Sequence, residues 1–212
     1  MNIVVEPHPR RLRLSQTMVE DFICDPVLAA KVIMQFDLDR FQRARLRHFW
    51  WTPYLIDSSG VSSGKTIVDW IYANLRALLL PDHWVAVYYP TFATGQNTFW
   101  IYYQQCRAPL FQAQLGAMED DEEKGKAKTK GPSAYKAHFR AGGELIMPAP
   151  SFLLDANTQA SLRANTLVVE EYTEVDKRSK GINAQLLRSV TDRKSTRLNS
   201  SHITISYAVF CL

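Results

Sequence analysis

The chain contains 212 residues, of which 46% are hydrophobic and 22% are charged, and its formal net charge is +4. This length suits one α/β domain with its own core, and the composition excludes a disordered or fibrous chain. No apolar run approaches the length that spans a bilayer, so we expect no membrane partner. The three cysteines are far apart in the sequence, which argues against a zinc site or a disulfide framework.

The first segment, residues 1–24, contains two prolines and a basic cluster, Arg10, Arg11 and Arg13. We expect a loosely ordered basic arm. Its arginines could contact a phosphate backbone, although a solvated chain terminus is the simpler interpretation. From Pro26 to Phe49 the spacing of apolar residues then predicts a helix.

Phe41 and Gln42 fall within this helical stretch. A glutamine amide carries both a donor and an acceptor, so Gln42 could pair with the edge of an adenine while Phe41 stacks on the base. Gln42 could equally be a polar residue on an exposed helix face. The residues that follow in the sequence help to decide between these two interpretations of Gln42.

A loop of small residues follows the short apolar segment Tyr54–Ile56, which suits a buried strand. The loop and the residues that close it are Ser59, Gly60, Val61, Ser62, Ser63, Gly64, Lys65 and Thr66. An apolar stripe at helical spacing continues to Leu79. A strand, a small-residue loop ending in Gly-Lys-Thr, and a helix form the context of a phosphate-binding loop.

The residue types in this loop suit phosphate chemistry. Small residues allow backbone N–H groups to approach phosphates, and the helix N-terminus favours negative charge. Lys65 would contact the β- and γ-phosphates, and the Thr66 hydroxyl would hold Mg²⁺. The pattern is degenerate, because Ser59 stands where the usual motif has glycine and Gly60 comes one position late. The alternative is a Ser/Gly helix cap with an exposed lysine.

Residues 84–89 read as a second strand, followed by a polar turn at residues 91–97 and an aromatic helix at residues 99–106. In this turn Thr94, Gln96 or Asn97 could sense a γ-phosphate or contact DNA, or could simply cap the helix.

Further along, residues 119–136 form a block of acidic and then basic residues without an apolar face, which predicts a mobile surface loop. The segment Phe139–Met147 then predicts a hairpin around Gly142 and Gly143.

Thr166–Val169 is a run of strand-forming residues that ends in two carboxylates, Glu170 and Glu171. An ATPase with a phosphate-binding loop needs such a pair opposite the loop. Glu170 would hold Mg²⁺ through its water shell, and Glu171 would orient and deprotonate the attacking water. The usual first carboxylate is aspartate, so Glu170 is a second departure from the common pattern.

Taken together, these motifs resemble the ATPase domain of the large terminase subunit, the motor that packages double-stranded DNA into phage proheads. The resemblance covers roughly residues 25 to 190 and includes Tyr89–Gly95 and the acidic strand end with Glu174, Asp176 and Gly181–Asn183. It implies an α/β P-loop NTPase fold of the ASCE type, with a mainly parallel sheet flanked by helices.

The resemblance also implies the activity. The domain would be a Mg²⁺-dependent ATPase that binds ATP between Gln42 and Lys65. An arginine finger could come from a neighbouring subunit, for which Arg140 is our candidate. Double-stranded DNA, a portal protein and a small terminase subunit would be its partners, in a homo-oligomeric ring in the host cytoplasm. The family's nuclease domain is missing from this sequence.

The last residues, 192–212, resemble a translated sequencing adapter. Asp192–His202 matches a common adapter residue for residue, and Ile205–Leu212 resembles the sequence that follows it. We therefore expect a basic arm at 1–24, an incomplete ATPase domain at 25–191, and a non-native tail. The tail has three basic residues and one acidic residue, so the net charge without it is +2.

Two other interpretations remain open. One is a helicase or translocase of superfamily 2, which shares the phosphate-binding loop and the acidic strand end. Such a protein would normally show Asp-Glu-x-His, whereas this chain has Glu170-Glu171-Tyr172-Thr173. The other is a truncated fragment without function.

Overall fold

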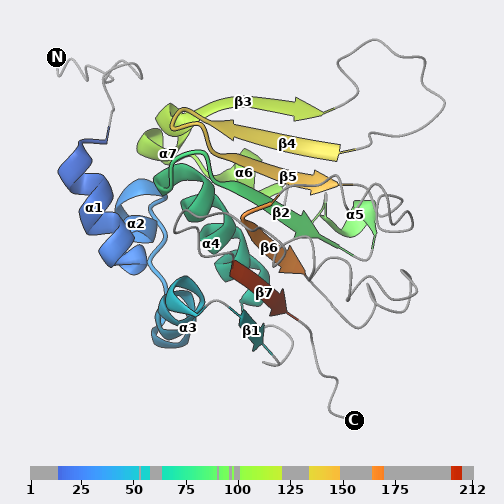
Figure 1. Ribbon diagram of the computed structural model, residues 1–212, viewed down its shortest axis with the longest axis horizontal. Coiled ribbons are helices and arrows are strands. Elements are labelled where there is room, and N and C mark those ends of the chain that lie inside the picture. Colours follow the sequence, from blue (N-terminus) through green and yellow to red (C-terminus); the bar gives the residue numbers. More distant parts are fainter. Residues whose placement is uncertain are drawn as a thin grey trace, which may run out of the picture.

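The computed structural model describes residues 14–52, 54–57, 64–89, 91–95, 97, 101–120, 134–148, 164–169 and 202–206 (Figure 1). Its helices are α1 (Gln16–Cys24), α2 (Pro26–Ile33), α3 (Arg40–Trp51), α4 (Lys65–Leu79), α5 (Phe92–Gly95), α6 (Ile101–Gln105) and α7 (Pro109–Gln114). Its strands are β1 (Tyr54–Asp57), β2 (Trp84–Tyr88), β3 (Leu115–Asp120), β4 (Ala134–Phe139), β5 (Glu144–Pro148), β6 (Thr166–Val169) and β7 (His202–Ser206).

The strands form one seven-stranded sheet in the order β1-β7-β6-β2-β5-β4-β3. The pairs from β1 through to β5 are parallel, whereas β4 pairs antiparallel with both β5 and β3. The expected α/β class and its mainly parallel sheet are therefore confirmed. The sheet also has an antiparallel edge, of which only the β4–β5 hairpin was predicted from the sequence. Strand β3 and helix α7 were not predicted.

The register of the parallel strands determines which residues end at the same edge of the sheet. Ile56 in β1 is level with Ile205 in β7, which is level with Val169 in β6, and Val169 is level with Tyr88 in β2. These strands therefore deliver the residues that follow them to one edge. Open α/β sheets place their binding groups at this carboxyl edge.

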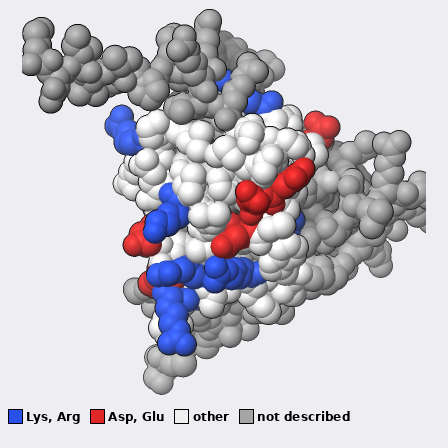
Figure 2. All heavy atoms as spheres, turned by 90° about the vertical axis from the view of Figure 1, so that its left-hand side faces the viewer, with Lys and Arg blue, Asp and Glu red and all other residues white. Residues whose placement is uncertain are grey.

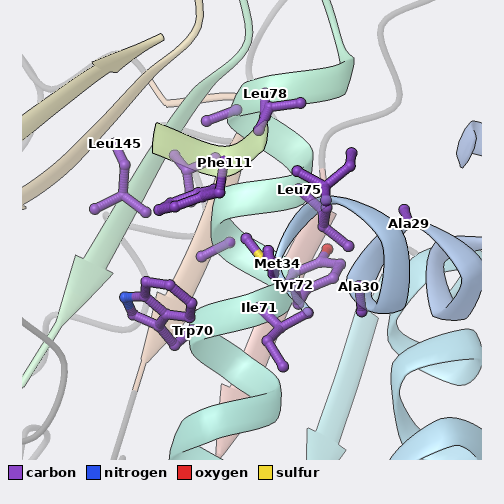
Figure 3. Packing of buried hydrophobic residues seen from close by; sticks show 14 of the residues in the cluster. Ala29, Ala30, Met34, Trp70, Ile71, Tyr72, Leu75, Leu78, Phe111 and Leu145 are labelled. Carbon is purple, nitrogen blue, oxygen red and sulfur yellow. The ribbon is translucent and has the colours of Figure 1, made fainter. Parts of the chain in front are cut away.

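Helix α4 forms the centre of the core. Every residue from Val68 to Leu79 is buried, as expected for a helix enclosed by other elements on all sides. Figure 3 shows Trp70 near Phe111 and Leu145, on the side of the sheet, while Ala29 and Ala30 of α2 lie on the other side of the helix. The Trp70 and Phe111 rings have centroids 5.6 Å apart.

Two buried polar side chains of α4, Asn74 and Arg76, form hydrogen bonds that reach neighbouring helices. The Arg76 guanidinium donates to the Trp50 carbonyl oxygen (2.7 Å) and lies 4.6 Å from the centroid of the Trp50 ring. The Asn74 amide donates to the Trp70 carbonyl oxygen and accepts from the Tyr103 hydroxyl. Burial raises the Tyr103 pKa far above its ordinary value. These contacts attach α3 and α6 to the central helix.

Two expectations for the N-terminal region are wrong in part. Ser15–Cys24 does not belong to a loose arm, because the Ser15 hydroxyl caps α1 and Phe22 of that helix is buried in the core. The single helix expected from Pro26 to Phe49 is two helices. Gln35, between them, has a φ of 59°, and Asp39 begins α3 with its own cap.

The expected hairpin at Phe139–Met147 is confirmed as the turn between β4 and β5. Its second glycine lies so close to α4 that a Cβ atom at Gly143 would be 1.8 Å from the Ala77 carbonyl oxygen. The charge block is shorter than expected, because Glu119 and Lys136 are paired positions of β3 and β4. Residues 121–133 lie outside the described part.

Strand β7 comes from the segment that resembles a sequencing adapter. It pairs with β1 on one side and with β6 on the other. No helix or strand was predicted for this segment, so β7 is a finding of the structure. Within the described ranges, no helix combines the length and apolar character needed to cross a membrane.

Candidate nucleotide-binding site

The candidate site begins where the chain leaves β1 and enters α4. Gly64 precedes the helix in the left-handed conformation, with φ 71° and ψ 26°. Glycine adopts this conformation without the strain that a Cβ atom would introduce. Among the described residues, no side-chain hydrogen bond caps the start of α4, and the first N–H groups of a helix have no partner within it. This helix end therefore offers backbone donors to an anion.

Gln42 of α3 packs against this turn. A Cβ atom added at Gly64 would lie 2.4 Å from Nε2 of Gln42, so the close approach is possible only because residue 64 has no side chain. The two residues that the sequence analysis singled out for the base and for the phosphates thus come together, from α3 and from the start of α4. Their proximity is the main geometric support for a nucleotide site.

Gln42 also has a structural function at the start of α3. Its backbone N–H donates to Oδ1 of Asp39 (2.8 Å), and its side-chain Oε1 accepts from the Asp39 backbone N–H (3.0 Å). This is a capping box. An amide oxygen has a second lone pair and the amide nitrogen has two donors, so Gln42 retains hydrogen-bonding capacity. Phe41 beside it is 82% exposed.

Lys65 and Thr66 occupy the first turn of α4. Lys65 is only 9% exposed, and Thr66 is half-buried. Asp69, one turn further along the helix, is fully buried. Residues four apart share a helix face, so a carboxylate lies on the Lys65 side of α4. Asp69 was not among the predicted site residues, although an acidic residue within an apolar stripe, four positions after the loop lysine, is a usable signal.

The remaining loop and strand-end predictions fall outside the described part of the chain. These residues are Ser59, Gly60, Val61, Ser62, Ser63, Glu170 and Glu171. Val169 is the last described residue before the two glutamates. Val169 is two strands away from β1, on the same level as Ile56, which corresponds to about 10 Å between the two strands.

The turn after β2 lies at the same edge. The Thr94 backbone N–H donates to Oγ1 of Thr91 (3.0 Å), and the two hydroxyl groups are 2.7 Å apart. Thr91 therefore caps the short helix α5, whereas the cap expected from Thr94, Gln96 or Asn97 concerned the helix at residues 99–106. Gln96 lies outside the described residues, and Asn97 is exposed. Burial raises the Tyr88 pKa well above its ordinary value, so this edge keeps a neutral phenol.

Arg140 lies at the amino edge of the sheet, opposite the carboxyl edge at which the candidate site lies. It is exposed in the turn between β4 and β5, and its backbone N–H donates to the Gln114 carbonyl oxygen. That turn precedes β5, which runs parallel to β2, so it lies at the amino ends of the parallel strands. Lys65 follows the carboxyl end of β1. Within one chain, the structure does not bring Arg140 to the candidate site.

Of the two expected Mg²⁺ ligands, Thr66 and Glu170, only Thr66 lies among the described residues. Among them, no group of three or more histidine, cysteine, aspartate or glutamate side chains could hold a metal ion. Thr66 supplies a hydroxyl beside the loop lysine, as a Mg²⁺-nucleotide site requires. Glu170, the other expected metal ligand, lies outside the described part of the chain.

The fold and the site define a class: a mixed α/β domain in which a helix that begins after Gly64 follows β1 at the carboxyl edge of the sheet. Solved structures with a similar fold include phage large terminases. The large terminase ATPase domain of a Thermus phage matches with a TM-score of 0.53 at 12% identity, over 95% of this chain and 72% of that one. A mutant of that domain gives 0.55 at 12% identity, over 92% and 70%.

The large terminase of a thermophilic bacteriophage gives a TM-score of 0.53 at 10% identity, over 81% of this chain and 39% of that one. This chain therefore spans well under half of that protein. At such identities the likeness concerns the fold. No protein-family model matches the sequence, and neither does any curated protein.

Proposed function

We propose that this chain is the ATP-binding and ATP-hydrolysing domain of a terminase-like motor that moves double-stranded DNA. The observation that carries the proposal is the contact between Gln42 and Gly64 at the start of α4. It combines a group able to recognise a base with a helix end able to bind phosphates. The fold likeness to terminase ATPase domains supports the choice of motor.

Each residue of the site has a proposed function. Residues 59–64 and the first N–H groups of α4 bind the phosphates, and Lys65 neutralises their charge. Gln42 recognises the base, and Phe41, being exposed beside it, offers a stacking surface. Thr66 and Glu170 hold Mg²⁺, which stabilises negative charge on the phosphates when it is bound. Glu171 acts as the general base toward water.

An arginine that stabilises transition-state charge would come from a neighbouring subunit. Arg140 is suited to this only in trans, because it lies at the far edge of its own sheet. A ring of subunits, a portal protein and a small terminase subunit as partners, and action in the host cytoplasm complete the proposal. Residues 192–212 are proposed to derive from a sequencing adapter.

ATP hydrolysis by the 212-residue chain tests this proposal. Phosphate release would be measured with Mg²⁺ and ATP, with and without duplex DNA. We expect turnover that Lys65→Ala and Glu171→Gln abolish, whereas replacement of the exposed Arg107 by alanine leaves it unchanged. Undiminished turnover in either site variant would contradict the assignment. Loss of turnover in all three variants would point to a general folding defect instead.

A further inference from the structure

The outward face of α3 is basic and carries an exposed tryptophan. Four residues make up this α3 arginine face: Arg40, Arg43, Arg47 and Trp51. The three arginines are exposed, and 61% of the Trp51 surface is accessible. Figure 2 views the side of the molecule on which α1, α2 and α3 lie in Figure 1, and basic side chains form a band low on that side.

The helix separates this face from the core. Leu46, Phe49 and Trp50 of α3 are buried, and they are spaced three and four apart as one helical stripe requires. Arg40, Arg47 and Trp51 fall on a separate stripe, along a helix about 17 Å long between its ends. None of these exposed side chains belongs to the buried apolar stripe of α3.

The charges around this face leave it positive. Within Arg40–Trp51 there is no acidic residue. Asp25 pairs with Arg47 at 3.4 Å, with both side chains about half exposed. The Arg43 Nε donates to the Leu38 carbonyl oxygen (2.7 Å). Asp37 and Asp39 precede the helix, and Asp39 is occupied in its cap. Arg40 makes no ion pair with any described residue.

These groups match the chemistry of one kind of partner. Guanidinium groups bind phosphates through two parallel hydrogen bonds, which favours arginine over lysine at phosphate contacts. An exposed indole among them offers a surface on which a base can stack. Stacking requires a base that is not already enclosed in a duplex, so the combination suits a single strand better than a double helix.

We propose that the α3 arginine face binds single-stranded nucleic acid. Arg40, Arg43 and Arg47 contact the phosphate backbone, and Trp51 stacks on a base. This site is distinct from the proposed nucleotide site, because it uses the outward stripe of α3 whereas Gln42 faces the start of α4. It also concerns a single strand rather than the duplex that the motor would move.

Fluorescence anisotropy with a labelled 20-nucleotide single strand and its duplex, at several salt concentrations, tests this proposal. The variant Arg40→Gln/Arg47→Gln should weaken binding of the single strand on the order of tenfold at low salt, because phosphate contacts are lost. The affinity of this variant for the single strand should also depend less steeply on the salt concentration. Trp51→Leu should weaken binding about fivefold or more, and Trp51→Phe should restore part of it.

The control is Lys31→Gln/Arg107→Gln, which removes two exposed basic residues outside α3. It should bind as the unaltered chain does. Equal weakening by the control and the α3 variant would overturn the proposal, as would binding of the single strand that no α3 variant changes. A variant that lost self-association but not nucleic-acid binding would assign the face to a second copy of the chain instead. Lys65→Ala should leave strand binding intact, which separates this site from the ATPase proposal.

Discussion

Gln42 and Gly64 are in such close contact that a side chain at residue 64 would overlap the Gln42 amide, whose Nε2 lies 2.4 Å from the position of a Cβ atom. Gly64 is also the residue whose φ of 71° starts α4. One glycine thus satisfies two requirements, a left-handed turn and the approach of α3. The candidate site depends on both.

Replacement of Gly64 by alanine tests this relationship. We expect Gly64→Ala to lower the free energy of unfolding by about 1–2 kcal/mol through the left-handed conformation alone, with a further loss from the overlap with Gln42. The double variant Gly64→Ala/Gln42→Ala should recover only the stability that is lost through the overlap with Gln42. Chemical denaturation of the four chains in this cycle measures it. Strictly additive losses would mean that the two side chains do not interact.

Gln42 can be tested separately from its capping function. Glutamate also completes a capping box, so Gln42→Glu should keep the thermal stability of the chain, whereas Gln42→Ala should cost about 1 kcal/mol. We expect the unaltered chain to prefer ATP over GTP in competition binding. Glutamate lacks the amide donors, so Gln42→Glu should lose this preference. Retained preference would exclude Gln42 from base recognition.

The hairpin turn provides a purely structural prediction. A Cβ atom at Gly143 would be 1.8 Å from the Ala77 carbonyl oxygen, whereas one at Gly116 would be 3.3 Å from the His138 carbonyl oxygen. Gly143→Ala must push β5 away from α4 and should destabilise the fold by about 3 kcal/mol or more. Gly116→Ala is the matched control and should cost much less. Similar melting temperatures for the two variants would contradict the packing of this hairpin.

The cysteines should differ in reactivity. Burial raises the pKa of the Cys106 thiol, and its Sγ lies near the Met34 carbonyl oxygen, whereas Cys24 is exposed. The thiolate is the reactive form, so in a Cys211→Ser background a thiol reagent at pH 8 should modify Cys24 quickly. Cys106 should react only when denaturant is added. Rapid modification of both would show that the region around Cys106 opens readily.

Strand β7 offers a prediction about the end of the chain. β1 pairs with β7 and β7 with β6, so truncation after Thr191 removes the strand that joins β1 to the rest of the sheet. We expect the truncated chain to melt at a lower temperature, as seen by circular dichroism. An unchanged melting curve would place β7 outside the stable fold. The adapter origin of this segment stays a prediction, which an independent read of the source DNA would test.

Much of this fold follows from local sequence patterns. The apolar runs of β1, β2 and β6, the stripe of α4 and the paired glycines of the β4–β5 hairpin all carried a readable signal. The break after Met34 did not, because apolar spacing continues across it while the Asp39 cap restarts the helix. The contact between Gln42 and Gly64 is a matter of tertiary packing. Sequence can nominate both residues, but only the arrangement of α3 against α4 brings them together.

Equilibrium binding of a fluorescent ATP analogue with Mg²⁺ tests the central claim most directly, because it does not depend on turnover. The account predicts saturable binding by the 212-residue chain, displaced by unlabelled ATP and weakened at least tenfold in Lys65→Ala, with thermal unfolding unchanged. Binding that Lys65→Ala does not weaken, or no binding by the unaltered folded chain, would contradict a nucleotide site at the start of α4.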